Sequence, residues 1–315
     1  MASVTTRINN IKLPQNKNIS SSWFKKEIYY DDKELFDYGI LHGSVIGTVV
    51  DYLTRFSFGT PVEKAFSATI RGAIIAEMYA SQYSFLKFFK GAYSKALDYL
   101  NNIKGLDENS VFYACKLIEY NVWAKNPIGA INAFLNMSEY EPDNATIQDI
   151  ITMINRNKRF FESYGPLISN GFTFEPPNAS EEESMRFQLE KNFNFGGYTP
   201  TVDCGDGDFL TNDTIWDLKV CKDPSIKINS RLQVVMYWIM GQHSKQEKFK
   251  NITKVGIYNP RCNISYILDI EKIPKTTIKY IEDKIICYNQ TNFTLSHTKI
   301  PIPRGFLVVE SSKTA

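Results

Sequence analysis

Apolar positions divide the chain into a helical first part and a strand-rich last part. Apolar residues recur every three or four positions in 34–57 and through most of 62–163, and this spacing predicts helices. A stretch rich in Pro, Ser and Glu at 174–187 interrupts the pattern and predicts a loop. Beyond it, five strands are predicted, GGYTPTVDCG, DFLT, TIWDLKVC, ITKVGIYNP and CNISYILDI, with one helix between the third and the fourth.

This order of elements predicts an α/β fold, because a helix lies between strands that we expect to share one sheet. A last helix is predicted near 274–288. The predicted division of the chain is an irregular N-terminal arm (1–33), a first core helix (34–57), a helical insertion or subdomain (58–175), a core of sheet and helices (190–292) and a C-terminal tail (293–315).

The composition narrows the class of protein. Hydrophobic residues make up 43% of the 315 residues and charged residues 22%, which is typical of a globular chain. No apolar run approaches the roughly 20 residues that span a bilayer. The five cysteines, at 115, 204, 221, 262 and 287, show neither a disulfide framework nor paired zinc spacing. We therefore expect a reduced, cytoplasmic protein with no membrane partner.

The first core helix carries glycines at intervals of four residues, at Gly39, Gly43 and Gly47. Each glycine costs roughly 1 kcal/mol of helix stability relative to alanine. Together they form a bare stripe that lets another backbone come close, and Asp51 is the next position on the stripe. Asp51 either lies on the rim of a helix contact or stands where the helix meets the sheet.

The stretch GDGDFLTNDTIWDLKV (205–220) is the most acidic part of the strand-rich region. Asn212 and Asp213 suit a two-residue hairpin turn. In that register Phe209 faces Trp216 and Asp208 faces Asp217, with Cβ atoms about 5 Å apart. Lys219 then shares a face with Asp217, because side chains alternate along a strand.

Two carboxylates this close repel each other unless one binds a proton or a cation lies between them. Mg²⁺ suits such a pair, since it takes one or two carboxylates, keeps several waters and accepts phosphate oxygens. A neighbouring lysine can orient a water molecule, help to deprotonate it and offset charge on a phosphoryl group. This set suits phosphodiester hydrolysis, whereas the alternative is a solvated hairpin with an incidental Asp217–Lys219 pair.

The helix KINSRLQVVMYWIMG (227–241) has a predicted buried stripe, made by Ile228, Leu232, Val235, Met236 and Ile239. Gln233 and Tyr237 lie together at the edge of that stripe. Gln233 is either a structural amide or a group that holds a water molecule or a phosphate oxygen beside the carboxylates.

These residues together resemble the PD-(D/E)xK nuclease superfamily, and the Q-x-x-x-Y element resembles its RecB-like exonuclease branch. The matching positions are G-x-x-D, D-x-K and Q-x-x-x-Y, which here are Gly205, Asp208, Asp217, Lys219, Gln233 and Tyr237. The resemblance covers roughly residues 195–290 and one N-terminal helix, and it implies a restriction-endonuclease-like α-β-β-β-α-β core with a large helical insertion. It also implies that Asp208, Asp217 and the Leu218 carbonyl bind one or two Mg²⁺ or Mn²⁺ ions, with Lys219 in catalysis.

The chain departs from the family pattern at two places. Gly207 stands where the name-giving proline is found. RecB-like members often carry G-x-x-x-His on the first core helix, whereas here Asp51 follows Gly47 at that spacing. Asp51 is therefore the candidate third metal ligand, with Glu77 as its rival. The remaining candidates are read as structural or loop positions: His42, Asp206 and Asp213.

A basic block follows the acidic stretch. Between Lys219 and Arg261 the chain has nine basic residues and two acidic ones. We expect phosphate contacts of a DNA backbone from Lys222, Lys227, Arg231 and Arg261. The predicted function is a Mg²⁺-dependent deoxyribonuclease, and the alternatives are a nucleic-acid-binding module without turnover or an interaction protein that binds a protein partner through its helical region. A phage, mobile-element or defence setting is expected from the family alone.

Overall fold

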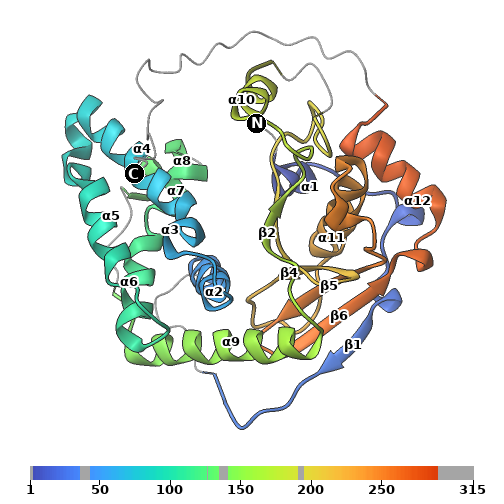
Figure 1. The fold of residues 1–315 in the computed structure, drawn as a ribbon, viewed down its shortest axis with the longest axis horizontal. Coiled ribbons are helices and arrows are strands. Elements are labelled where there is room, and N and C mark those ends of the chain that lie inside the picture. The colour runs from blue at the N-terminus through green and yellow to red at the C-terminus, as the bar shows by residue number, and fades with distance from the viewer. Residues whose placement is uncertain (1–2, 36–42, 126, 135–140, 191–194, 290–315) are drawn as a thin grey trace, which may run out of the picture.

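The computed structural model describes residues 3–35, 43–125, 127–134, 141–190 and 195–289. Figure 1 shows helices α3 to α8 on one side, and the sheet with α11 and α12 on the other. Helix α9 runs between the two sides. Among the helices in these ranges, none is both long enough and apolar enough to cross a membrane.

Six strands form one mixed sheet in the order β1-β6-β5-β4-β3-β2. The strands are β1 (Lys25–Ile28), β2 (Ser169–Thr173), β3 (Asp206–Leu210), β4 (Thr214–Leu218), β5 (Lys254–Asn259) and β6 (Ile264–Asp269). Neighbours are antiparallel except β4 and β5, which are parallel. The chain passes from β4 to β5 through helix α11 (Ile228–Ser244), because parallel neighbours need a crossover connection. The predicted α/β class is confirmed in this form.

Eight of the described helices, α2 to α9, lie between β1 and β2 in sequence. The described helices are α1 (Val4–Asn9), α2 (Gly43–Ser57), α3 (Val62–Ala65), α4 (Ser67–Gln82), α5 (Ala92–Asn101), α6 (Glu108–Ile118), α7 (Asn121–Lys125), α8 (Pro127–Phe134), α9 (Asn144–Ser163), α10 (Glu181–Glu190), α11 and α12 (Lys275–Tyr280). Short 3₁₀ turns are η1 (Gln15–Lys17), η2 (Ser21–Trp23), η3 (Ser84–Phe89), η4 (Glu247–Phe249) and η5 (Ile270–Lys272), and η6 (Ile281–Ile286) is a π-helical turn after α12. The predicted helical region from 62 to 163 is thus confirmed over its described residues.

The N-terminal segment is part of the folded core, so the prediction of an irregular arm is wrong. Val4 and Ile8 on α1 are buried, and so is Ile19. Strand β1 pairs with β6 and forms one edge of the sheet. A short polar stretch such as KKEI has too weak a periodicity to predict a strand. Strand β1 forms because it pairs with the apolar strand β6.

Three other boundaries differ from prediction. Strand β2 forms the opposite edge of the sheet, although it lies in the range predicted as a helical insertion (58–175). Helix α10 occupies much of the predicted loop at 174–187. The predicted strand at 196–205 is reduced to isolated bridges.

One face of the sheet is covered by α9 through aromatic side chains. Phe160 stacks on Tyr258 of β5 with ring centroids 3.8 Å apart, and its edge meets Trp216 of β4 at 4.9 Å. Phe161 packs on Phe209 of β3 at 4.8 Å. The end of α9 is therefore part of the sheet's core.

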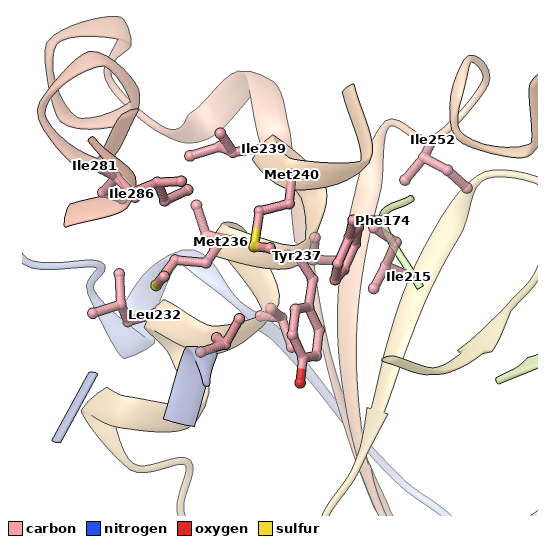
Figure 2. Packing of buried hydrophobic residues seen from close by; sticks show 14 of the residues in the cluster. Phe174, Ile215, Leu232, Met236, Tyr237, Ile239, Met240, Ile252, Ile281 and Ile286 are labelled. Atoms are coloured by element: carbon pink, nitrogen blue, oxygen red, sulfur yellow. The ribbon is translucent and has the colours of Figure 1, made fainter. Parts of the chain in front are cut away.

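The other face is covered by α11. Figure 2 shows Tyr237 of this helix beside Phe174 and Ile215, and Met236 extending toward Leu232. Of the predicted stripe, Leu232, Val235, Met236 and Ile239 are buried. Ile228 is exposed, against prediction, because it is the first residue of the helix and lies beyond the core.

Helices α4 and α7 approach each other most closely at Gly72. A β-carbon added there would lie 1.9 Å from the carbonyl oxygen of Tyr120. We predict that Gly72→Ala lowers the free energy of unfolding by about 2 kcal/mol or more, since backbone must move to make room. Gly43→Ala, at a helical glycine with open space around it, is the matched control, and urea unfolding measures both. Equal stability of the two variants would contradict this packing.

Strand β1 also carries a partly exposed polar network that makes stability depend on pH. The Glu27 carboxylate is paired with Lys25 at 2.7 Å and accepts hydrogen bonds from the hydroxyls of Tyr164 and Tyr29. The hydrogen bonds that Lys25 and Tyr164 donate to Glu27 lower its pKa from 4.5 to about 2. The charged form is therefore favoured by folding, and its contribution is present above pH 4.5 and lost as the pH falls towards 2.

We expect Glu27→Gln to lower the urea midpoint at pH 7 and to reduce the further loss that the wild-type protein shows between pH 4.5 and pH 2. Urea unfolding at several pH values measures both effects. If the variant lost as much stability as the wild-type protein between pH 4.5 and pH 2, groups other than Glu27 would cause this pH dependence.

Candidate active site

The hairpin of β3 and β4 has the predicted register. Phe209 pairs with Trp216 and Leu210 with Ile215. Past this point the pairing opens, and an oxygen of the Asp208 carboxylate accepts the backbone N–H of Leu218 at 2.7 Å. Asp208 and Asp217, which are predicted to lie opposite each other, are thus located where the two strands separate.

Asp217 and Lys219 form a close ion pair at the end of β4. The Lys219 ammonium donates to Oδ1 of Asp217 at 2.9 Å and lies 2.7 Å from Oδ2. The Asp217 side chain is only 2% exposed, and Oδ2 receives no hydrogen bond among the described residues. Oδ2 is thus faced by the Lys219 ammonium, and a buried carboxylate has further lone pairs that a hard cation would accept.

Helix α2 brings a second pair of charges to Asp208. Arg55 donates to both carboxylate oxygens of Asp51, four residues earlier, at 2.9 Å. The same guanidinium lies 3.4 Å from Asp208. As the glycine stripe predicts, α2 meets the end of β4, since a β-carbon added at Gly47 would lie 3.7 Å from that of Val220.

Strand β2 makes room for Arg55 with a glycine. Asn170 pairs with Phe209 and Phe172 with Gly207, so Gly171 stands opposite Asp208. Gly171 has a φ of +91°, and a β-carbon there would lie 2.5 Å from the Arg55 guanidinium. A side chain at this position would displace Arg55, which places Gly171 among the residues that shape the site.

The charges at the site do not balance. Burial raises the pKa of Asp208 well above 3.8, and the charges of Asp51 and Asp217 raise it further. Burial likewise raises the pKa of Asp217, while Lys219 lowers it. Three carboxylates against the two cations Arg55 and Lys219 leave one negative charge, which either a proton on Asp208 or a divalent cation would offset.

Lys219 itself is held protonated. Burial lowers its pKa, but the charges of Asp217 and Asp208 outweigh this effect and raise the pKa above 10.5. In this state the ammonium can offset negative charge and donate hydrogen bonds, but it cannot accept a proton.

Gln233 and Tyr237 lie one helical turn apart on α11. The Gln233 side-chain amide donates to the Tyr237 hydroxyl at 2.7 Å. Burial raises the pKa of Tyr237, and the charges of Asp217 and Asp208 raise it further. Figure 2 shows this hydroxyl pointing away from Met240, at the edge of the apolar cluster.

The four predicted phosphate contacts divide into two kinds. Lys222 and Lys227 are exposed in the segment after β4. The Arg231 guanidinium donates to the carbonyl of Ile19, and the Arg261 side chain, 7% exposed, lies 3.7 Å from Asp149. Both arginines thus have partners within the protein, and their phosphate contacts stay a prediction.

The remaining predicted acids lie elsewhere. Glu77 accepts the backbone N–H of Tyr93 in the helical region, so its place is a structural one. Asp213 lies in the hairpin turn, as predicted, and pairs with Lys254 at 2.7 Å. Asp206 is an exposed residue of β3 rather than a loop residue. His42 and Gly39 lie outside the described residues.

A cavity of about 140 Å³ adjoins Lys219. The loop after β4, the start of α11 and strands β5 and β6 form its walls, and Lys227, Ser225, Ser230 and Asn259 supply polar groups. The cavity lies next to the ion pair, and its lining is more apolar than polar.

Within the described ranges, no three His, Cys, Asp or Glu side chains are arranged to hold a metal ion. Asp51, the predicted third ligand, has both carboxylate oxygens paired with Arg55. Sequence reasoning missed Arg55, although its spacing of four residues from Asp51 on one helix was a usable signal of a pair.

Neither the scan of protein-family models nor the searches of curated proteins and of solved structures finds a match for this chain. The functional assignment therefore depends on the chemistry of the site and on the motif resemblance.

Proposed function

We propose that the protein is a metal-dependent nuclease that hydrolyses DNA phosphodiester bonds. The observation that carries the proposal is the pair Asp208 and Asp217 on the adjacent strands β3 and β4, with Lys219 bonded to Asp217. Asp217 is buried, and the Asp208 side chain is 19% exposed. The parallel pair β4 and β5, joined through α11, agrees with the restriction-endonuclease-like core that the motifs imply.

The two carboxylates have the donor chemistry that Mg²⁺ or Mn²⁺ requires. Asp208 and Asp217 would hold the ion, with the Leu218 carbonyl as a further oxygen and Asp51 available if Arg55 moves. The burial of Asp217 and the repulsion among the three carboxylates both support this fit. When bound, the ion would supply an activated water and offset charge on the phosphoryl group.

The chain's own groups have separate roles in this proposal. Lys219 stays protonated and stabilises negative charge that develops on the phosphoryl oxygens. Arg55 keeps Asp208 in place and balances its charge. Gln233 orients a water molecule or a phosphate oxygen, with Tyr237 holding its amide. Lys222 and Lys227 bind the DNA backbone, so affinity should fall steeply with salt.

One observation favours a second candidate, a nucleic-acid-binding module without turnover. Arg55 already bridges Asp51 and Asp208, so part of the acidic site is neutralised by the protein itself. This candidate predicts DNA binding that is unaffected by divalent cations.

Cleavage of linear and circular DNA, in Mg²⁺, in Mn²⁺ and in EDTA, distinguishes the two. The nuclease proposal predicts cleavage with either cation and none in EDTA. Cutting of linear DNA alone would indicate dependence on ends, whereas cutting of circles would indicate internal sites. Binding without cleavage under every condition would favour the second candidate.

A further inference from the structure

The segment between α4 and α5 exposes an unusual number of aromatic rings. Tyr83, Phe85, Phe88 and Tyr93 are 45%, 55%, 60% and 41% exposed. Lys87, Lys90 and Lys95 are exposed among them. We call these seven residues the aromatic–lysine patch. Large apolar side chains gathered on a surface mark an interaction site more often than scattered ones do.

Buried side chains beneath the patch hold its backbone in place. Leu86, in the middle of η3, is fully buried. Phe89 packs edge-on against the buried Trp123 with centroids 5.0 Å apart. Tyr83 stacks on Tyr79 at 6.1 Å. The exposed rings therefore project from a rigid support, which lowers the entropy cost of binding a partner.

Positive charge surrounds the rings. The 20 residues from Met78 to Leu97 contain three lysines and no acidic residue, although the whole chain carries only +2. The Lys95 ammonium lies 5.9 Å from the Phe88 ring centroid and 5.7 Å from that of Tyr99. Aromatic rings with lysines between them suit a partner that has flat faces and negative charge.

We propose that the aromatic–lysine patch binds single-stranded nucleic acid, with bases stacked on Phe85 and Phe88 and phosphates on the lysines. Every base has a π face, so stacking tolerates any sequence, and each stacked base typically contributes about tenfold or more in affinity. Duplex DNA offers no free base faces and would meet only the lysines. The inference extends the proposed function to its substrate, a nucleic acid with a single-stranded part, but binding here does not require cleavage.

Fluorescence anisotropy of the full chain with a labelled oligothymidylate and with a duplex of equal length tests the proposal, in EDTA to prevent cleavage. We expect the double variant Phe85→Ala/Phe88→Ala to weaken oligothymidylate binding at least tenfold and duplex binding less than threefold. Lys87→Glu/Lys90→Glu should weaken both and reduce the salt dependence. Phe88→Trp should retain the affinity, because it retains the stacking surface.

Tyr30→Ala and Lys12→Glu, at exposed positions in the N-terminal segment, are the matched controls. Unchanged oligothymidylate affinity in the double alanine variant, or an equal loss for duplex, would overturn the proposal. Binding of vesicles with anionic lipid, lost in that variant while oligothymidylate affinity is unaffected, would assign the patch to membranes instead. Single-strand binding that persists in a protein without cleavage activity would leave this inference intact and reject only the proposed catalysis.

Discussion

Asp217→Asn is expected to lower the rate of DNA cleavage at least a thousandfold in Mg²⁺. The substitution keeps the shape of the side chain but removes the charge that we assign to the metal and to Lys219. Loss of an interaction needed in the transition state appears in kcat, whereas loss of ground-state binding appears in KM. We therefore expect the fall in kcat, with DNA affinity in EDTA changed less than threefold.

Asp213→Asn is the matched control, because Asp213 is an acid of the same hairpin that pairs with Lys254 away from the site. It should retain cleavage within about threefold, since an exposed pair of this kind contributes little. Lys219→Ala should resemble Asp217→Asn. Full activity in either of these two variants would contradict the assignment of the catalytic pair.

Arg55→Met is expected to have the largest effect on stability. The guanidinium is 14% exposed and serves two carboxylates, so its loss leaves buried charges without a partner. Breaking a buried pair on one side costs about 3–5 kcal/mol of unfolding free energy. Urea unfolding in EDTA should show this loss.

Divalent cation should restore part of that stability. With Arg55 removed, three carboxylates face only Lys219, so Mg²⁺ should bind more strongly than in the wild-type protein and stabilise the fold by mass action. Arg159→Met is the control, since Arg159 pairs with Asp31 but is 60% exposed. If Arg55→Met lowered the unfolding free energy by less than about 1 kcal/mol, or if Mg²⁺ did not raise it in this variant, the proposed role of Arg55 in balancing the carboxylate charges would be wrong.

Local patterns predicted the chemistry of the hairpin because its register depends on a short turn. Asn212 and Asp213 set the pairing of Phe209 with Trp216, and alternation then assigned Asp217 and Lys219 to one face. The buried face of α11 followed in the same way from helical spacing. Glycine spacing predicted that α2 meets the sheet, which the approach of Gly47 to Val220 confirms.

Contacts between distant segments could not be predicted in this way. β1 and β2 are short edge strands whose places depend on β6 and β3, not on their own polar sequences. Basic residues were treated as surface charge, yet Arg261 is buried beside Asp149. Arg55 required knowledge of two partners at once, one local and one 153 residues away.

Anomalous diffraction from crystals soaked in Mn²⁺ tests most directly whether Asp208 and Asp217 are metal ligands. We predict an anomalous peak within coordination distance of both carboxylates, about 2.0–2.2 Å for a small hard cation. The same soak of Asp217→Asn crystals should show the peak lost or much reduced. A peak elsewhere in the chain, or none in wild-type crystals at millimolar Mn²⁺, would contradict the assignment of this hairpin as the metal site.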